Sequence, residues 1–595
     1  MSIYSSLQKK LEEGIYLIKS KLSRRQFILF SSIVVGATSA FAAILLKRFV
    51  HVIFEFATHN RISNYKFFYL LLPMIGIFLT VFVIGKFLGG SLNKGLAQIH
   101  SAIAKKSSFM PRRNMFDQLL TSSLTVGFGG STGLEAPIVI TGAAFGSNYS
   151  KTYRLNYSER TLLLACGISA GIAAAFNAPI AGVLFALEVL LVDISISAFT
   201  PLIIASATGA LISIITLNDS ILLNFKSTQN FNYWNLPFYI LLGVFAGLVA
   251  VYHTRTFFKV ENFLSKRIRK PIWRILLAGI VLAALIAVFP PLFGEGYQSI
   301  KLLAEKHPEE LFNNSIIQFL SSNELIVLGF VGLLIFLKSI ATALTIGGGG
   351  NGGNFAPSLF IGAYLGFFVS RLVNYFKLAE LPENNFTLVG MAGILSGLYH
   401  APLTSIFLIA EITGGYSLMI PLMIVSSISF AVSKYFEPFS MDAKSLAKKG
   451  ETFTTDKDFN VLTTIRTNEL VEKDYPLLSP FSTLRTLVEV VSQSKRNIFP
   501  VTDKNGNLMG VVLLDDIREI MFKPDSYDTI QIKELMRMPL ALIQADENMN
   551  QVMKYFDETG AWILPVVKDY KFVGFISKSN VFSGYRDKLK DHTIE

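Results

Sequence analysis

The sequence predicts an all-α, polytopic membrane region followed by a smaller α/β soluble region. Of the 595 residues, 51% are hydrophobic and 16% are charged, and the mean hydropathy is +0.47. A soluble protein of this size rarely has such a composition. Apolar runs that can span a bilayer recur along the chain, for example at 27–46 and 67–88. Near residue 437 the composition changes to that of an ordinary soluble domain.

Basic residues near the apolar runs indicate how the chain is oriented in the membrane. Lys19, Lys21, Arg24 and Arg25 precede the first run, and the loop at 265–274 is also basic. By the positive-inside rule, we expect the N-terminus and this loop to lie in the cytoplasm. The net charge of +12 reflects this bias. We expect no nucleic-acid partner, because the basic residues are not interleaved with a surface on which bases could stack.

These features divide the chain into a cytoplasmic N-terminal segment, a membrane domain, a linker and two soluble domains, at 1–25, 26–436, 437–463, 464–526 and 527–595. Cys166 is the only cysteine, which excludes a disulfide within the chain and a cysteine-based metal site. The seven histidines are scattered without the spacing of metal ligands. We therefore expect no metal site.

One charged residue stands out within the membrane region. Glu135 lies in the stretch GGSTGLEAP, residues 129–137, inside a long apolar segment. Three glycines precede this residue, and a proline follows it two positions later. Proline fits well at the start of a helix, whereas Gly-rich backbone is poor in a helix interior. The stretch is therefore interpreted as a loop that starts a helix within the membrane.

The membrane region also contains an internal repeat. GLEAPIVITGAAFG (133–146) aligns without gaps on GNFAPSLFIGAYLG (353–366), with six identities in fourteen positions and an offset of 220. Residues 167–188 align on 390–411 at an offset of 223, with an Ala-Pro pair and a final glutamate in common. Chance similarity between Gly/Ala-rich segments is the alternative. Matches in the same order and at nearly the same offset favour two related halves.

Each half places a Gly-rich loop before a helix, and the second loop is GGGGNGGNFAP, residues 347–357. The free N–H groups and the positive dipole end of a helix N-terminus favour an anion. We expect the two helix starts to converge near the midplane, as broken helices do in transporters built from repeats. Two converging N-termini predict an anion site, and the carboxylate of Glu135 can compete with a permeating anion for it.

The motifs GLEAP (133–137) and GNFAP (353–357) resemble two signature motifs of the CLC family of chloride channels and proton-coupled chloride transporters. Residues 158–188 and 337–366 resemble family segments along nearly their whole length, and the resemblance covers 25–450. It implies a CLC-like inverted repeat of about eighteen helices. It also implies a homodimer with one pathway per subunit, in which each subunit moves chloride.

The resemblance implies roles for individual residues. Glu135 matches the gating glutamate, which blocks the anion path when ionised and vacates it when protonated or displaced. A buried glutamate satisfied by backbone donors is the alternative. Ser91, Gly133, Asn354 and Phe355 match chloride-binding positions, and at Asn354 and Phe355 the backbone amides would hold the anion.

Three further positions carry weaker expectations. Lys338 is charged within an apolar run, and it could either add positive potential to the anion path or pair with a glutamate. Around Ser91 the sequence GGSLNKG keeps the hydroxyl but lacks the Gly-Ile-Pro of the family motif. Asp442 aligns where the family usually has a tyrosine, so we expect an inner gate that is more open or differently built.

The exchangers of the family commonly carry a second glutamate that relays protons. It directly follows the position of Glu188, where this chain has Val189, which cannot carry a proton. Glu188 and its repeat equivalent Glu411 are interpreted as helix-packing or interface groups. The missing relay favours a channel over an exchanger, although exchange through water stays open.

The tail resembles a pair of CBS domains. Residues 499–517 and 564–582 share an apolar strand, a polar turn, a glycine and a β-branched strand that leads into a helix. Such pairs often bind adenine nucleotides, with Ser or Thr near phosphate and an acid on the ribose. A purely structural or dimer-stabilising module is the alternative.

Each CBS half keeps only part of the nucleotide pattern. Asp516 is present in the first half, but Leu513 replaces the hydroxyl residue. Ser577 is present in the second half, but Asn580 replaces the acid. We expect weak or no nucleotide binding and no other cofactor.

Taken together, the sequence predicts a chloride channel-like protein of the cytoplasmic membrane, gated by Glu135 and without enzymatic activity. The N-terminus and the CBS domains are expected in the cytoplasm. A proton/chloride antiporter is the alternative within the same class. Two alternatives belong to another class. A CBS-regulated divalent-cation transporter would need several oxygen ligands along its pore. A non-conducting sensor would differ from a channel only in that it shows no ion flux.

Overall fold

The computed structural model describes residues 19–58, 68–90, 92, 95–105, 108–190, 196–217, 231–305, 307–447, 462 and 465–592. By its internal contacts the chain forms two compact units, residues 1–450 with 594–595 and residues 451–593. The first unit holds the apolar helices, and the second holds the strands.

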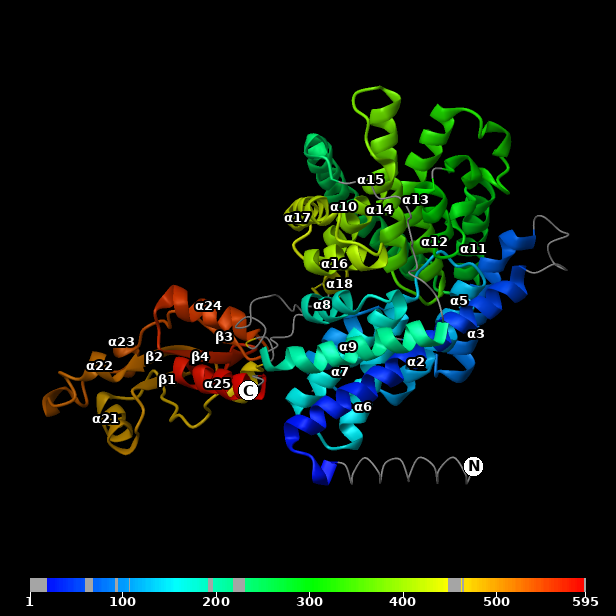
Figure 1. Cartoon of the computed structure of the whole chain (residues 1–595). Coiled ribbons are helices and arrows are strands. Elements are labelled where there is room, and N and C mark those ends of the chain that lie inside the picture. Colours follow the sequence, from blue (N-terminus) through cyan, green and yellow to red (C-terminus); the bar gives the residue numbers. More distant parts are fainter. Residues whose placement is uncertain are drawn as a thin grey trace. The chain divides into compact units, whose positions relative to one another are not determined.

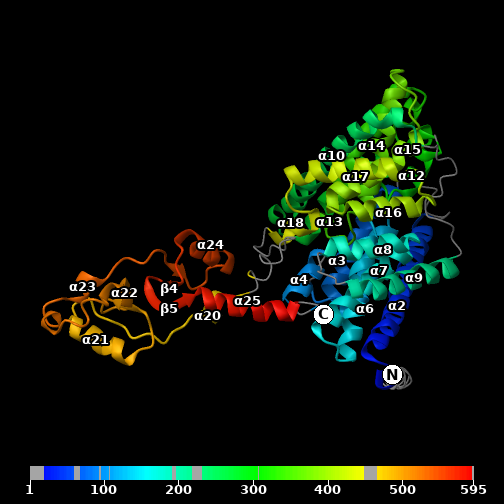
Figure 2. The same cartoon turned by 60° about the vertical axis from the view of Figure 1, so that its left-hand side comes forward.

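The membrane unit is helical, and Figures 1 and 2 colour its first half from blue to cyan and its second half from green to yellow. The first half contains α2 (Arg24–Thr58), η1 (Phe68–Leu71), α3 (Leu72–Phe87), α4 (Ala97–Lys105), η2 (Arg112–Met115), α5 (Asp117–Gly127), α6 (Glu135–Thr152), α7 (Tyr157–Phe176), α8 (Pro179–Leu190) and α9 (Ile196–Leu217). The second half contains η3 (Tyr233–Asn235), α10 (Leu236–Arg267), α11 (Pro271–Val288), η4 (Pro290–Leu292), α12 (Tyr297–Ala304), η5 (Pro308–Phe312), η6 (Gln318–Leu320), α13 (Glu324–Gly348), α14 (Phe355–Tyr375), α15 (Glu383–Tyr399), α16 (Pro402–Ile412), α17 (Met419–Phe436) and α18 (Met441–Ala447).

Length and composition allow many of these helices to cross a bilayer. Among the described residues, nine helices are long and apolar enough to span it, and the apolar helices at Pro179–Val189 and Pro402–Ile412 are shorter. A helix needs about 20 apolar residues to span a bilayer, so neither of the two short helices is long enough to span it by itself. The predicted all-α, multi-pass membrane region is confirmed.

The repeat seen in the sequence has a structural counterpart. Helix α6 packs on α7 in the first half, and α14 packs on α15 in the second. Helices α7 and α15 both end at a left-handed residue, Asn177 with φ 55° and His400 with φ 56°, at equivalent positions of the repeat. The short helices α8 and α16 follow directly and pack on each other.

The two Gly-rich loops meet where α6 and α14 begin. Gly133 donates its amide to the Gly353 carbonyl at 2.9 Å, and Gly353 donates back to Gly133 at 2.8 Å. A Cβ at Gly353 would lie 2.7 Å from the Cβ of Ala136, and one at Gly133 would lie 2.9 Å from the Cβ of Ala356. Glycine is therefore required at both positions, because two backbones that approach so closely leave no room for a side chain.

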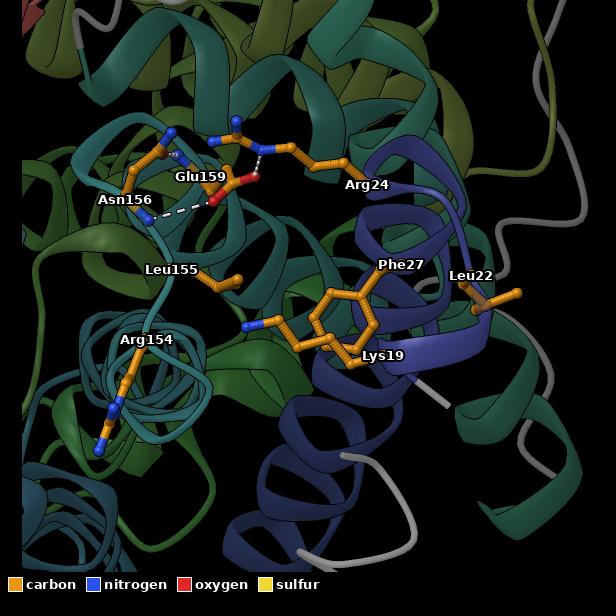
Figure 3. Close-up of a pocket in the computed structure, with 8 residues that line it drawn as sticks. All are labelled: Lys19, Leu22, Arg24, Phe27, Arg154, Leu155, Asn156 and Glu159. Carbon is orange, nitrogen blue, oxygen red and sulfur yellow. Dashed lines mark hydrogen bonds and ion pairs between the residues drawn. The ribbon is translucent and has the colours of Figure 1, made fainter. Parts of the chain in front are cut away.

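A polar cluster joins the start of α2 to the start of α7 (Figure 3). Arg24 pairs with Glu159 at 2.6 Å, and Asn156 caps α7 by accepting from the Glu159 amide at 2.8 Å. The Glu159 carboxylate in turn accepts a hydrogen bond from the Asn156 amide at 3.1 Å, which completes a capping box. The surface pocket at this cluster is lined by Lys19, Leu22, Arg24, Phe27, Arg154, Leu155, Asn156 and Glu159. It includes no residue of the two Gly-rich loops.

The second unit contains two short sheets with helices. Its elements are α20 (Thr467–Leu470), α21 (Leu484–Gln493), β1 (Ile498–Thr502), β2 (Leu508–Leu513), α22 (Leu514–Ile517), η7 (Pro524–Ser526), α23 (Ile532–Leu535), β3 (Ile543–Gln544), α24 (Met549–Thr559), β4 (Ile563–Lys568), β5 (Lys571–Ser577) and α25 (Lys578–His592). Strand β1 pairs antiparallel with β2, and β4 pairs antiparallel with β5 and parallel with β3. Tyr475, Ile498, Val511 and Phe575 form a small core shared by both halves. The predicted α/β tail is confirmed.

Replacing Gly353 with alanine should force the two Gly-rich loops apart, because the new Cβ would lie 2.7 Å from that of Ala136. We expect a lower thermal unfolding midpoint for the purified protein, at a cost of about 1–3 kcal/mol, as for other overpacked sites. Gly329→Ala in α13 is the matched control, since its Cβ would meet nothing within 4 Å. A midpoint for Gly353→Ala as high as that of the control would contradict this prediction.

Candidate functional site

The carboxylate of Glu135 connects the two halves of the membrane unit. Glu135 is the first residue of α6 and only 4% exposed. Its Oε1 accepts a hydrogen bond from the Tyr297 hydroxyl at 2.7 Å, and its Oε2 accepts one from the Ala356 amide at 3.4 Å. Ala356 lies in the first turn of α14. The side chain of one helix start therefore reaches the backbone of the other.

This position suits negative charge for two physical reasons. The N–H groups in the first turn of a helix have no partner inside the helix. The dipoles of α6 and α14, which are 18 and 21 residues long, also place partial positive charge at these N-termini. A carboxylate held here occupies a donor that a free anion could use instead.

A second carboxylate, which is only partly buried, stands beside Glu135, and our sequence analysis did not identify it. Glu295 accepts a hydrogen bond from the Leu134 amide at 3.2 Å, and the charge of Glu135 acts on it. The loop that carries Glu295 is docked by the Gly294 amide, which donates to the Gly129 carbonyl at 2.9 Å. The N-terminus of α6 thus holds two carboxylates, one from each half of the chain.

Two lysines, one fully buried and one partly buried, lie near these carboxylates. Lys338 is fully buried, and its ammonium donates to the Ser131 hydroxyl and to the Gly294 carbonyl, both at 2.9 Å. Its charge acts on Glu295, and the charge of Lys47 acts on both Glu295 and Glu135. Lys338 therefore ties the loop before α6 to the loop before α12, and it forms no salt bridge with a carboxylate in the described part of the chain.

The predicted chloride-binding residues fall into three groups. Asn354 and Phe355 lie at the start of α14, and the Asn354 side chain lies 3.3 Å from Nε2 of the buried His253. The amide of Gly133 donates to Gly353, so this structure does not leave it open for chloride as we had expected. Ser91 lies outside the described residues.

Asp442 is the second residue of the short helix α18. Its carboxylate accepts a hydrogen bond from the backbone amide of Leu96, directly before α4 begins at Ala97. Helix α18 packs on both α4 and α15. A carboxylate thus occupies a helix N-terminus at this position too. This arrangement differs from the tyrosine hydroxyl that the family usually has here.

Glu188 and Glu411 each cap the N-terminus of the other short helix. Glu188 of α8 accepts hydrogen bonds from the amides of Leu403 and Thr404 of α16, at 3.0 and 2.7 Å. Glu411 of α16 accepts from the amides of Ile180 and Ala181 of α8, at 3.0 and 2.8 Å. Each carboxylate satisfies free N–H groups of the other helix, which accounts for its presence in both halves. The interpretation as helix-packing groups agrees with these contacts.

The CBS unit engages its candidate nucleotide residues internally. Asp516 pairs with Arg537 at 3.3 Å. Ser577 and Asn580 both donate to the Glu472 carboxylate, at 3.2 and 2.9 Å, and Arg496 also pairs with Glu472.

The negatively charged Glu472 carboxylate therefore occupies the donors of the residues that would hold a nucleotide. The same cluster affects Tyr475, because burial and then the charge of Glu472 raise the pKa of Tyr475 to about 12. An incoming phosphate or ribose would have to displace this carboxylate from Ser577 and Asn580.

Comparison with known proteins agrees with these features. The family model for the voltage gated chloride channel matches residues 76–434, and the CBS domain model matches 468–523 and 532–587. A ClcB-like chloride channel protein of Ralstonia nicotianae is 27% identical over 360 residues, which cover 60% of this chain and 80% of the relative. The voltage-gated ClC-type chloride channel ClcB of Escherichia coli is 29% identical over 318 residues, which cover 53% of this chain and 71% of the relative.

Solved structures share the fold at lower sequence identity. A slow cyanobacterial Cl⁻/H⁺ antiporter aligns with a TM-score of 0.61 and 21% identity, over 72% of this chain and 98% of its own. A eukaryotic CLC transporter aligns with a TM-score of 0.59 and 18% identity, over 95% of this chain and 98% of its own. The chain therefore belongs to the CLC family of voltage-gated chloride channels and transporters, and it carries two C-terminal CBS domains.

Proposed function

We propose that this protein moves chloride passively through a pathway that the Glu135 carboxylate closes. The observation that carries the proposal is the contact of this carboxylate with the Ala356 amide at 3.4 Å, at the N-terminus of α14. In its ionised form Glu135 occupies a donor that suits chloride. In its neutral or displaced form it leaves that donor to the anion.

Neighbouring groups would complete the anion site. The amides of Asn354 and Phe355 precede that of Ala356 at the start of α14, where helical N–H groups lack intrahelical partners. We assign them, with the hydroxyl of Ser91, the role of chloride donors. Lys338 and Lys47 add positive charge near the path and limit the repulsion between Glu135 and Glu295.

Asp442 would act at the inner side of the path. Its carboxylate sits at the N-terminus of α4 through the Leu96 amide, much as that of Glu135 sits at the start of α14. An ionised Asp442 repels chloride, so entry from this side requires its protonation or displacement. This gives the pathway two carboxylates at helix N-termini.

The transport mode we propose is that of a channel with weak or absent proton coupling. Val189 is buried and carries no titratable group directly after Glu188, which is held as a cap on α16. The relative from Escherichia coli is named a channel, which supports the same reading. We further propose a homodimer in the cytoplasmic membrane, with the N-terminus and the CBS pair in the cytoplasm.

Chloride flux through the protein should rise as the pH falls, because protonation of Glu135 removes its charge from the Ala356 amide. Where the neutral fraction is small, it grows about tenfold for each pH unit, which sets the steepest expected response. Glu135→Gln and Glu135→Ala should conduct with little remaining pH dependence. Chloride efflux from liposomes from about pH 7.5 to about pH 4.5 measures this response.

Glu309→Gln is the matched control for these variants, because its carboxylate is half exposed and pairs with His307. We expect it to keep the wild-type response to pH. If Glu135→Ala also keeps that response, Glu135 is not the gate.

A chloride gradient should drive little or no uphill proton movement, because Val189 leaves the usual inner relay position without a titratable group. Proton and chloride fluxes measured together in liposomes give the ratio of the two ions. A fixed stoichiometric ratio would favour the antiporter alternative. A reversal potential that follows potassium or a divalent cation in place of chloride would reject the anion pathway altogether.

We propose that the CBS pair is mainly structural and binds ATP or ADP weakly or not at all. Calorimetry on the purified full-length protein should show no micromolar dissociation constant, which would correspond to about −8 kcal/mol. Glu472→Ala should free Ser577 and Asn580 and thereby strengthen any binding. Micromolar binding by the wild type would show that the Glu472 carboxylate is displaced easily.

A further inference from the structure

We propose that the hydroxyl of Tyr399 donates a hydrogen bond to the permeating anion, on the inner side of Glu135. Tyr399 would thus be a chloride ligand supplied by the C-terminal end of α15. The inference rests on the proposed function, because it assigns one further donor to the same anion pathway. Four observations on this side chain carry it.

The ring of Tyr399 packs at the start of α14. Its centroid lies 5.7 Å from that of Phe355, at an angle of 46°. Phe355 is the first residue of α14 and directly precedes Ala356, whose amide donates to Glu135. Tyr399 therefore stands next to the helix N-terminus that the gate carboxylate occupies.

The hydroxyl of Tyr399 is unused within the described protein. Tyr399 is 8% exposed, and no hydrogen bond joins its hydroxyl to any residue that the structure describes. Some side-chain oxygens and nitrogens are fully buried and have no hydrogen-bond partner in the structure. The hydroxyl of Tyr364 is one of these atoms, and the hydroxyl of Tyr399 is not. A hydrogen bond to an incoming acceptor would satisfy this hydroxyl in its mostly buried surroundings.

Two carboxylates act electrostatically on the Tyr399 phenol. They are those of Asp442, which sits at the start of α4, and Glu135, which sits at the start of α14. Neither carboxylate accepts a hydrogen bond from this hydroxyl in the structure. An anion that passes from one carboxylate to the other would therefore come near a donor that no described residue uses.

The internal repeat shows that packing alone does not require this hydroxyl. At the equivalent position of the first half, offset by 223 residues, the chain has Phe176. The ring of Phe176 also packs on Phe355, with centroids 5.4 Å apart. Both rings fill space around the same residue, and only Tyr399 adds a donor to it.

The chemistry selects a small anion that accepts hydrogen bonds. A phenol donates one hydrogen bond, and bonds to charged acceptors are stronger than neutral ones. Loss of one such bond should weaken chloride binding by about tenfold. The ring would keep its contact with Phe355.

The test compares chloride binding to full-length wild type, Tyr399→Phe and Tyr364→Phe, measured by calorimetry on purified protein, with liposome efflux as a second readout. Tyr364→Phe is the matched control, because it removes a buried hydroxyl that is sealed from solvent. We expect an approximately tenfold larger dissociation constant for Tyr399→Phe, with an unchanged unfolding midpoint, and wild-type binding for Tyr364→Phe.

Two results would overturn the proposal, and they are distinguishable. If the wild type binds and moves chloride and Tyr399→Phe does so equally well, the hydroxyl is not a ligand, while the proposed function stands. If the wild type neither binds nor moves chloride, the proposed function fails and this inference fails with it. A weaker affinity shared by Tyr399→Phe and Tyr364→Phe would also overturn it, because it would show a general effect of removing hydroxyls.

Discussion

The hydrogen bond between the Glu135 carboxylate and the Ala356 amide joins the two halves of the membrane unit at their helix N-termini. It depends on the glycine bridge between residues 133 and 353, which brings the starts of α6 and α14 close enough for a side chain of one to reach the backbone of the other. The same bridge places two positive dipole ends, and N–H groups that lack a partner within their own helix, around a single point. A site built in this way from backbone favours an anion.

Charge balance around this point comes from groups that are distant in the sequence. Glu295 and Glu135 place two carboxylates at the start of α6, and two carboxylates so close oppose each other's ionisation. Lys338 and Lys47 offset part of this repulsion. Lys338 also holds the loops before α6 and α12 together through Ser131 and Gly294. A change in any one of these charges would therefore alter the energy needed to move Glu135.

Local pattern was enough to predict much of the fold and part of the site. The apolar runs and the repeat predicted the helical membrane unit. The glycines and the proline around Glu135 predicted a helix start, which the structure places at Glu135 itself. Glu295 was missed because its partner, the Leu134 amide, lies 161 residues away and only the tertiary fold brings them together. The lone carboxylate between Gly294 and Gly296 was the available signal, and it repeats the pattern of a charge beside glycines. The partners of Lys338 and the Glu472 contacts in the CBS unit likewise depend on long-range packing.

In the proposed function, Glu135 and a free anion compete for the Ala356 amide. A crystal structure of Glu135→Gln grown with bromide, compared with the wild type at neutral pH, tests it most directly through the anomalous signal of the ion. We predict a bromide within hydrogen-bond distance of the Ala356 amide in Glu135→Gln, and no bromide at this amide in the wild type while the carboxylate holds it. A wild-type structure with bromide on the Ala356 amide and the Glu135 carboxylate still bound there, or a variant without bromide at this amide, would contradict the account.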